Sequence, residues 1–433
     1  MISPVDLRTM ELTGIPPAGR TGEALVRWQL AQVRGLIAYL RSNTFYEERL
    51  ANIDEACIVA PGDLARLPFT CAGEVRTDPE SLLCVPARAV HRIATIRTSG
   101  STGEPKRFFF TEADLARTLD FFATGMRSLT GPGKRVAILL SSDVPDSIAS
   151  LLQTALRRIG AQATIHGHIF DLGTAAEAVQ GAHCLVGLPS ELLRLCRRYP
   201  ALRPESVLLT ADYVPEVVRR DLESSWRCRT FSHYGMTETG YGLAVQCDCC
   251  SAHHLRHADV LVEVVDPVSG RRLPAGEDGE VVVTTFSHEA MPLLRYRTGD
   301  LASLDIGTCP CGGVLPRLGR IKGRIADAVN LGGFYLTPGE LDETIYGCGG
   351  VRDYRASVRD VGTETVLSVV VDAEAETDHR TLERLLRGRL PEAVVLELTY
   401  EALPSSEGVK KRRIEREGQV AGVARTRKGP AAP

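Results

Sequence analysis

Residues 98–106 combine hydroxyl side chains, glycines and a lysine in a pattern that suits phosphate chemistry. They read Thr-Ser-Gly-Ser-Thr-Gly-Glu-Pro-Lys and follow the run 93–96, which is typical of a strand. Glycines allow the backbone to approach a ligand closely, and free N–H groups beside hydroxyls form a concave, donor-rich site for phosphate oxygens. The stretch lacks the G-x-x-x-x-G-K-[ST] spacing of a Walker loop. Taken alone, it is equally compatible with a flexible turn between two strands.

Three more polar blocks follow at intervals typical of one large fold. Residues 233–239 read His-Tyr-Gly-Met-Thr-Glu-Thr, residues 295–300 read Arg-Tyr-Arg-Thr-Gly-Asp, and a Gly-Arg pair occupies 323–324. In this order the four blocks resemble the adenylate-forming superfamily of acyl-CoA synthetases, and most closely its phenylacetate–CoA ligase branch. The resemblance extends from about residue 30 to residue 413. The blocks are specific as a set, whereas each motif by itself would be weak.

The resemblance implies an ATP-dependent ligase acting on an aromatic or similar small carboxylic acid. The acid and ATP would give an acyl-adenylate and pyrophosphate, and the acyl group would then pass to CoA with release of AMP. Such an enzyme must hold ATP and Mg²⁺ and neutralise the charge that builds on the α-phosphate. Thr237 would contact that phosphate, and Glu238 would bind Mg²⁺ as a hard carboxylate ligand. The β- and γ-phosphates would be wrapped by Ser99, Gly100, Ser101, Thr102 and Gly103.

The same resemblance places the nucleoside of ATP on the second and third blocks. Tyr234 would pack against adenine, with Gly235 in the same nucleotide-binding segment. Asp300 would accept both ribose hydroxyls, since a carboxylate offers two acceptor oxygens, and Arg324 would lie nearby. Singly, these residues have structural alternatives: Glu238 could cap a turn, Tyr234 could be a core aromatic, and Asp300 could pair with Arg297.

Two positions depart from the pattern of the family. Relatives rotate a C-terminal domain about a polar hinge two residues after the Gly-Arg pair, where this chain has Ala326, followed by Asp327. Ala is acceptable there because a hinge only has to absorb backbone rotation. The family also places a catalytic lysine in a C-terminal loop, at the position that Val409 occupies here. We expect a one-residue shift of the loop to bring Lys410 into place; a solvated basic run is the alternative.

The twelve cysteines are many for a cytosolic chain, in which Cys clusters more often indicate metal or catalysis than disulfides. Four residues offer the soft or borderline ligands of a closed tetrahedral zinc site: Cys247, His254, Cys309 and Cys311. The related ligases carry a Cys, a His seven residues on and a later Cys-Pro-Cys-Gly in these places. We expect a structural zinc ion, with reduced buried thiols as the alternative. The identity of the first two ligands is undecided from the sequence, because Cys249, Cys250, His253 and His257 are nearby candidates.

The length and net charge of the chain limit the number of domains and the kinds of partner that we expect. A chain of 433 residues is too long for one compact core and predicts two or three domains. The net charge of −3 predicts no strong attraction to nucleic acid or to an anionic membrane. The N-terminus lacks the pattern of a secretion signal, and no apolar run approaches the ~20 residues that span a bilayer. We therefore expect a soluble, cytoplasmic protein without nucleic-acid or membrane partners; a homodimer is left open.

The order of patterns predicts an α/β fold. Strand and helix patterns alternate up to about residue 231, which favours a largely parallel sheet, and a β-type period begins near 260. We expect a large, multi-subdomain N-terminal adenylation domain over 1–324, including a small β subdomain at about 245–322. A small mobile α+β domain over 325–420 and a disordered tail over 421–433 would follow. At the N-terminal end, the apolar spacing predicts a packing helix over 24–52.

Two rival functions are compatible with the same residues. The enzyme could pass the acyl group to a carrier-protein thiol, an amine or a cofactor hydroxyl instead of CoA. Alternatively, Val409 and Ala326 could mark a catalytically weak adenylate-binding or scaffold protein. Release of pyrophosphate with and without CoA separates these possibilities from the ligase.

Overall fold

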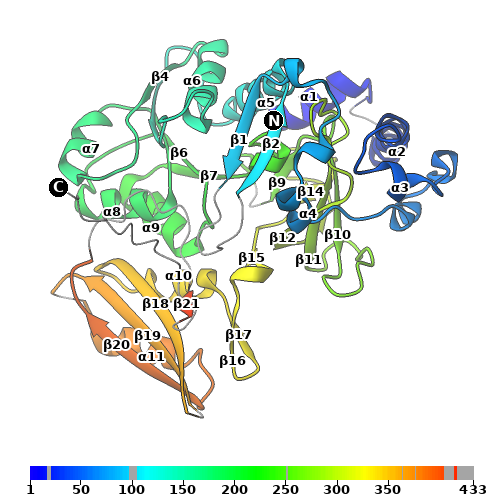
Figure 1. The fold of residues 1–433 in the computed structure, drawn as a ribbon. Helices are drawn as coiled ribbons and strands as arrows, with labels where there is room; N and C mark the ends of the chain where they lie inside the picture. Colours follow the sequence, from blue (N-terminus) through cyan, green and yellow to red (C-terminus); the bar gives the residue numbers. More distant parts are fainter. Residues whose placement is uncertain are drawn as a thin grey trace, which may run out of the picture.

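The computed structural model describes residues 1–16, 21–96, 105–249, 252–362, 364–375, 377–403 and 414–416. Figure 1 shows a larger body formed by the chain up to about residue 330, and a smaller unit of sheet and helix formed by the residues that follow. Several sheets and many helices alternate along the chain, so the expected α/β class is confirmed. No helix in these ranges combines the length and the apolar character needed to cross a lipid bilayer.

The largest sheet in the described chain has the strand order β13-β14-β9-β8-β7-β6-β5-β3-β4. Neighbouring strands from β7 to β4 run parallel, whereas β8, β9, β14 and β13 are added antiparallel. Parallel strands covered on both faces read as continuous apolar runs, and β5 and β6 are indeed buried along their whole length. The strands are β3 (Arg135–Leu139), β4 (Gln162–Ile165), β5 (Cys184–Gly187), β6 (Ser206–Leu209), β7 (Arg229–Tyr234), β8 (Ala244–Gln246), β9 (His253–Leu255), β13 (Leu304–Asp305) and β14 (Arg317–Leu318).

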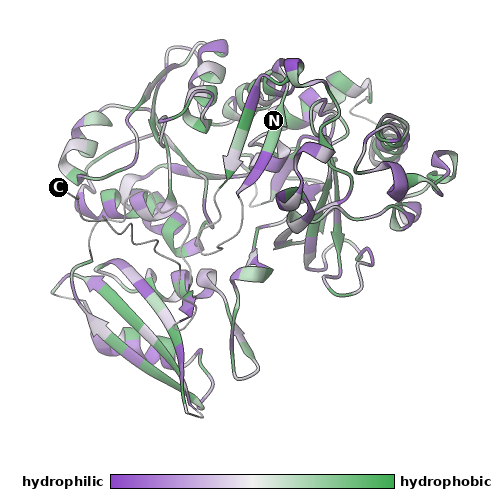
Figure 2. Ribbon diagram, viewed as in Figure 1, coloured by the Kyte–Doolittle hydropathy of each residue, from purple (hydrophilic) through white to green (hydrophobic). Residues whose placement is uncertain are grey.

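The two faces of this sheet belong to two hydrophobic cores. Val136 and Ile138 of β3 pack in the same core as α5 and α6, whereas Ala137 and Leu139 pack with α8 and α9. This is the alternation of a strand, whose successive side chains point to opposite faces. Figure 2 shows hydrophobic stretches running along the strands inside the molecule. The helices are α1 (Pro4–Thr13), α2 (Thr21–Leu40), α3 (Glu47–Leu50), α4 (Ala72–Thr77), α5 (Glu112–Met126), α6 (Ile148–Arg158), α7 (Leu172–Ala178), α8 (Pro189–Arg198), α9 (Glu216–Trp226), α10 (Pro338–Ile345) and α11 (His379–Arg387).

A second, antiparallel sheet and a separate hairpin flank the large sheet. The second sheet has the order β10-β11-β12-β15, and the hairpin pairs β1 with β2. Strands β10, β11 and β12 fall within the interval 245–322 in which a β subdomain was expected, whereas β8, β9, β13 and β14 extend the large sheet. The strands are β10 (Leu261–Val265), β11 (Gly279–Thr284), β12 (Tyr296–Ala302), β15 (Gly323–Arg324), β1 (Arg92–Ile96) and β2 (Lys106–Phe110).

The C-terminal unit contains a sheet of order β20-β19-β18-β21 and the hairpin β16-β17. It contacts the larger body at the start of α9, where the Glu343 carboxylate accepts the N–H of Glu216 at 2.7 Å and of Val217 at 3.1 Å. Arg197 of α8 donates to the Tyr346 carbonyl at 2.7 Å. The strands are β16 (Val329–Leu331), β17 (Phe334–Leu336), β18 (Val351–Val361), β19 (Glu364–Ala373), β20 (Val394–Tyr400) and β21 (Ile414–Arg416).

The helix predicted over 24–52 is wrong in its length. It ends at Leu40, and the chain turns before the short helix α3. The Asn43 side chain accepts the N–H of Phe45 at 3.1 Å and of Tyr46 at 3.3 Å, which stabilises a turn in place of further helix. Four helices that the sequence pattern did not identify, α1, α4, α7 and α9, are also present.

Candidate active site

A buried ion pair joins the end of the first polar block, residues 98–106, to the second polar block. The Nζ atom of Lys106, the first residue of β2, lies 2.5 Å from Oε1 of Glu238 in the short 3₁₀ helix η5 (Thr237–Thr239). Tyr296 of β12 donates to the same Oε1 at 3.0 Å and accepts from Lys106 at 3.3 Å. The side chains of Lys106 and Glu238 are only 10% and 7% exposed. Burial by itself would raise the pKa of Glu238, but Lys106 holds that pKa below its usual value, so the carboxylate stays ionised.

The backbone after β7 explains how Glu238 reaches this position. A Cβ atom on Gly235 would lie 2.3 Å from the backbone oxygen of Tyr241, so this close turn accepts only glycine. Gly240 closes η5 with a φ of 65°, in the left-handed region that favours glycine. Thr118 of α5 donates to the Gly240 carbonyl at 2.8 Å and ties the segment to the helix. The segment is therefore held by backbone packing on both sides of Glu238.

Asp300 forms the centre of a second cluster. It lies in β12 directly opposite Arg324 of β15, whose Nε donates to Oδ1 at 2.6 Å. The hydroxyl of Tyr234 donates to the other oxygen, Oδ2, at 2.8 Å. Burial and the Asp300 carboxylate raise the pKa of Tyr234 well above its usual value, so the phenol keeps its proton. The alternative pairing of Asp300 with Arg297 does not occur, because Arg297 binds Glu280 instead.

The two clusters are close enough to interact electrostatically. Burial opposes the charge of Arg324, but Asp300 and then Glu238 raise the pKa of this guanidinium above its usual value. Thr237 stands beside Glu238 in η5 and is partly exposed. The structure thus brings the second, third and fourth sequence blocks together at one place. The expected positions 99–103 and Lys410 lie outside the described residues.

The residues on either side of the segment 97–104, which lies outside the described residues, form a hairpin. Ile96, the last residue of β1, pairs in register with Lys106, the first residue of β2. This end of the hairpin therefore lies beside the Glu238 carboxylate, which Lys106 contacts. Sequence reasoning assigned no task to Lys106 or to Tyr296. Both residues could have been proposed from the sequence, because Lys106 is the last residue of the first block and Tyr296 lies inside the third.

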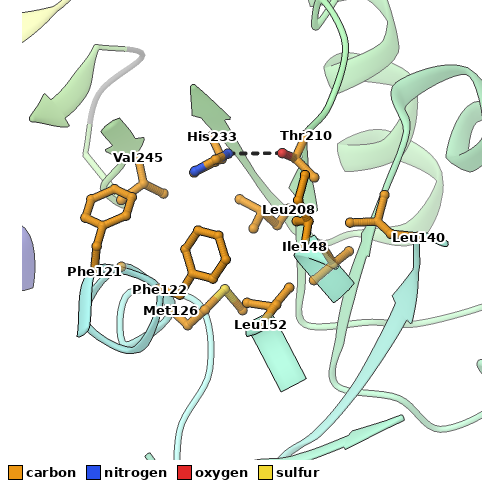
Figure 3. A pocket seen from close by; sticks show the side chains of 12 residues that line it. Phe121, Phe122, Met126, Leu140, Ile148, Leu152, Leu208, Thr210, His233 and Val245 are labelled. Carbon is orange, nitrogen blue, oxygen red and sulfur yellow. Dashed lines mark hydrogen bonds between the residues drawn. The ribbon is translucent and has the colours of Figure 1, made fainter. Parts of the chain in front are cut away.

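An apolar pocket opens at the carboxyl ends of the parallel strands, where ligands bind in such sheets. Its empty space, counted together with the solvent at its opening, is about 410 Å³, and it lies between β3, β5, β6 and β7 on one side and α5 and α6 on the other. Two polar side chains, Thr210 and His233, share it with apolar ones, and Figure 3 shows them bonded to each other. His233 belongs to the same strand as Tyr234. The apolar lining consists of Phe121, Phe122, Gly125, Met126, Leu140, Ile148, Leu152, Val186, Leu208 and Val245.

The four expected metal ligands come together in a buried cluster away from this pocket. The ligand atoms of Cys247, His254, Cys309 and Cys311 all lie within 4.8 Å of one another. Sγ of Cys247 and Sγ of Cys309 are 3.7 Å apart, far beyond a disulfide and close to the ~3.8 Å edge of a tetrahedron with ~2.3 Å Zn–S bonds. Nε2 of His254 lies 3.8 Å from Sγ of Cys311. The donor set and its spacing therefore fit zinc.

Contacts around the cluster orient the ligands. The Nδ1 atom of His254 lies 2.8 Å from Oδ1 of the buried Asp6 in α1, which directs Nε2 toward the sulfur atoms. Of the other candidates, Cys249 is exposed, His253 contacts Ser232, and His257 contacts the Pro316 carbonyl. Cys250 lies outside the described residues. None of the three described alternatives belongs to the cluster.

Comparisons with known proteins agree with this geometry. The phenylacetate-coenzyme A ligase of Thermus thermophilus is 28% identical over 90% of this chain and 96% of its own length. That of Pseudomonas putida is 26% identical over 82% and 84%. A crystal structure of 2-hydroxyisobutyryl-CoA ligase in the postadenylation state, 20% identical, shares the fold with a TM-score of 0.78 over 91% of this chain and 90% of that one. A family model described as AMP-binding enzyme matches residues 43–287, more than half of the chain. The resemblance expected from the four sequence blocks is confirmed: the chain belongs to the family of AMP-binding enzymes.

Proposed function

We propose that this protein is an ATP-dependent carboxylate–CoA ligase for an aromatic or similarly apolar acid. The acid and ATP would form an acyl-adenylate and pyrophosphate, and CoA would then take the acyl group with release of AMP. The observation that carries the proposal is the convergence of the Glu238 cluster, the Asp300 cluster and an apolar pocket around β7. The similar ligases named for phenylacetate and coenzyme A support the same activity.

The nucleotide would be held by the two clusters. Each oxygen of Asp300 has a second lone pair, so it can accept a ribose hydroxyl while Tyr234 and Arg324 remain bonded. Gly235 allows the close turn against Tyr241 that fixes the backbone next to Tyr234. Thr237 would contact the α-phosphate, and residues 99–103 would wrap the β- and γ-phosphates. The Asp300 cluster is therefore proposed as the ribose site.

Glu238 is the proposed ligand of Mg²⁺, which when bound would neutralise charge on the phosphates. Hard carboxylate oxygen suits this cation, and Lys106 keeps Glu238 ionised before the metal binds. Lys106 follows Gly103 by three residues in the sequence, so its ammonium would also contribute positive charge to the bound phosphates. Lys410 is the proposed catalytic cation of the C-terminal domain, residues 325–420, which would rotate near Ala326 in the 3₁₀ helix η6 (Ile325–Asp327).

A zinc ion is proposed at Cys247, His254, Cys309 and Cys311. Four protein ligands close a tetrahedral site, so the ion would have a structural task. It would link β8, β9 and the segment 309–311 to α1, because Asp6 of α1 contacts His254. With ATP and CoA as its substrates, the enzyme is expected to work in the cytoplasm.

The decisive assay is release of pyrophosphate with ATP, Mg²⁺ and a panel of aryl and short-chain acids, with and without CoA. We expect release that requires an acid, rises with CoA and is accompanied by an acyl-CoA of matching mass. Glu238→Gln should lower the rate on the order of 100-fold, as for other groups that stabilise developing charge. Lys134→Met, which alters an exposed ion pair, is the matched control. Release that ignores CoA would point to another acceptor, and no release from a protein that binds ATP would refute the ligase.

A further inference from the structure

The apolar pocket contains a hydrogen-bonding atom that the proposed ligase chemistry does not use. The Nδ1 atom of His233 lies 3.1 Å from Oγ1 of Thr210. The Nε2 atom is buried and has no hydrogen-bond partner among the described residues. Figure 3 shows this second nitrogen pointing toward the side of the pocket where Phe121 and Phe122 lie, and their ring centroids are 6.1 and 6.0 Å from that of His233.

The chemistry of this atom is that of a neutral imidazole. Burial lowers the pKa of His233 to about 4, with a smaller contribution from His253, so the ring is uncharged near neutral pH. One ring nitrogen then donates and the other accepts, and the bond with Thr210 decides which. In either tautomer Nε2 can form one hydrogen bond, which the aromatic and aliphatic side chains around it cannot provide. A buried polar atom without a hydrogen-bond partner costs free energy when the pocket is empty. A ligand that supplies this partner is therefore favoured.

We propose that His233 makes the pocket selective for an aromatic acid that carries a neutral hydroxyl group on its ring. This inference rests on the proposed function and defines its substrate more closely. A hydroxyl both donates and accepts, so it pairs with either tautomer of the imidazole. None of the lining side chains that the structure describes carries a charge, so a second carboxylate or an ammonium on the ring would be buried without a partner.

Matched acids that differ by a single hydroxyl test this proposal. Binding of phenylacetate and of 2-, 3- and 4-hydroxyphenylacetate is measured by calorimetric titration of the full chain with a non-hydrolysable ATP analogue and Mg²⁺. Pyrophosphate release is measured in parallel with ATP. We expect at least one hydroxy acid to be preferred over phenylacetate about 10- to 100-fold, because a site built around a hydrogen bond rejects the analogue that lacks it.

Variants then assign the preference to His233. His233→Phe should remove the hydroxyl preference, lowering affinity for the hydroxy acid more than for phenylacetate, whereas a merely structural effect would lower both alike. Thr210→Val should weaken the preference by freeing the ring, and Thr210→Ser should keep it. Equal binding of phenylacetate and all three hydroxy acids would overturn the proposal for His233. Turnover of any of these acids would still support the proposed ligase function. Absence of both binding and turnover for every acid would reject the proposed function as well.

Discussion

Replacement of Lys106 by methionine tests the buried pair with Glu238. The substitution removes the cation but keeps most of the volume, so Glu238 is left as a carboxylate that is 7% exposed. Removing one partner of a buried ion pair costs about 3–5 kcal/mol. Tyr296 still donates to Oε1 and Arg324 still acts on Glu238 at longer range, so we expect a loss near the lower limit, ~3 kcal/mol at pH 7.

The pH dependence of this loss distinguishes an uncompensated charge from a packing defect. In the native chain the pKa of Glu238 is below its usual value, so this group contributes stability above pH ~4.5 that disappears only in acid. In the variant, burial dominates and raises the pKa of Glu238 above that of the unfolded chain. The folded state then holds a proton that the unfolded state has lost, and stability falls as the pH rises through that interval, by up to ~1.4 kcal/mol per pH unit.

Urea unfolding of both chains between pH 5 and 8, without nucleotide, measures this difference. The only two tryptophans, Trp28 and Trp226, lie in α2 and α9 and report on the larger body. Lys134→Met is the control, because its partner Glu205 is 53% exposed and such pairs contribute about 0–1 kcal/mol. A Lys106→Met loss that is under ~1 kcal/mol, or that is the same at pH 5 and pH 8, would refute the reasoning.

Three further predictions follow from the other clusters. Asp300→Asn should weaken binding of an ATP analogue about 10- to 100-fold, since hydrogen bonds to a charged group contribute about 1.5–3 kcal/mol, and Tyr234→Phe should weaken it less; calorimetric titration measures both. Cys309→Ser should abolish stoichiometric zinc in metal analysis, whereas Cys57→Ser, at an exposed site, should not. Glu343→Gln should accelerate hydrogen exchange in α10. In the native chain, acidification below pH ~4.5 should lower the protection of the α10 amides relative to their intrinsic exchange rate at the same pH. Burial opposes the charge of Glu343, but the α9 N–H groups and Arg320 hold its pKa below the usual value, so stability is lost as the pH falls through that pKa.

Each of these has an outcome that contradicts it. ATP affinity that is unchanged in Asp300→Asn would remove the ribose assignment. Full zinc content in Cys309→Ser would mean that the metal, if present, is held elsewhere. Hydrogen exchange in α10 that is equal in Glu343→Gln and in the native chain would show that the contact with α9 contributes nothing to docking of the C-terminal unit.

The order of the four polar blocks was sufficient to predict the family, and the alternation of strand and helix patterns predicted the α/β fold. These properties follow from local chemistry, because a glycine that admits a close turn or a hydroxyl beside an N–H acts within a few residues. The start of α5 is of the same kind: Thr111 and Asp114 cap each other's backbone, and both residues lie within one turn. The overlong helix over 24–52 marks the limit of such reasoning, since apolar spacing continues across a turn that Asn43 stabilises.

The tertiary structure decided which distant residues meet. Lys106 and Glu238 are 132 positions apart, and His254 and Asp6 are 248 apart, so no local pattern connects them. The same holds for the choice of Cys247 and His254 over their neighbours, and for the meeting of His233 and Thr210 in one apolar pocket. The four sequence blocks indicate which reactive side chains the protein has. Strand order and helix packing decide which charges are buried together, and burial determines their pKa values and their strength.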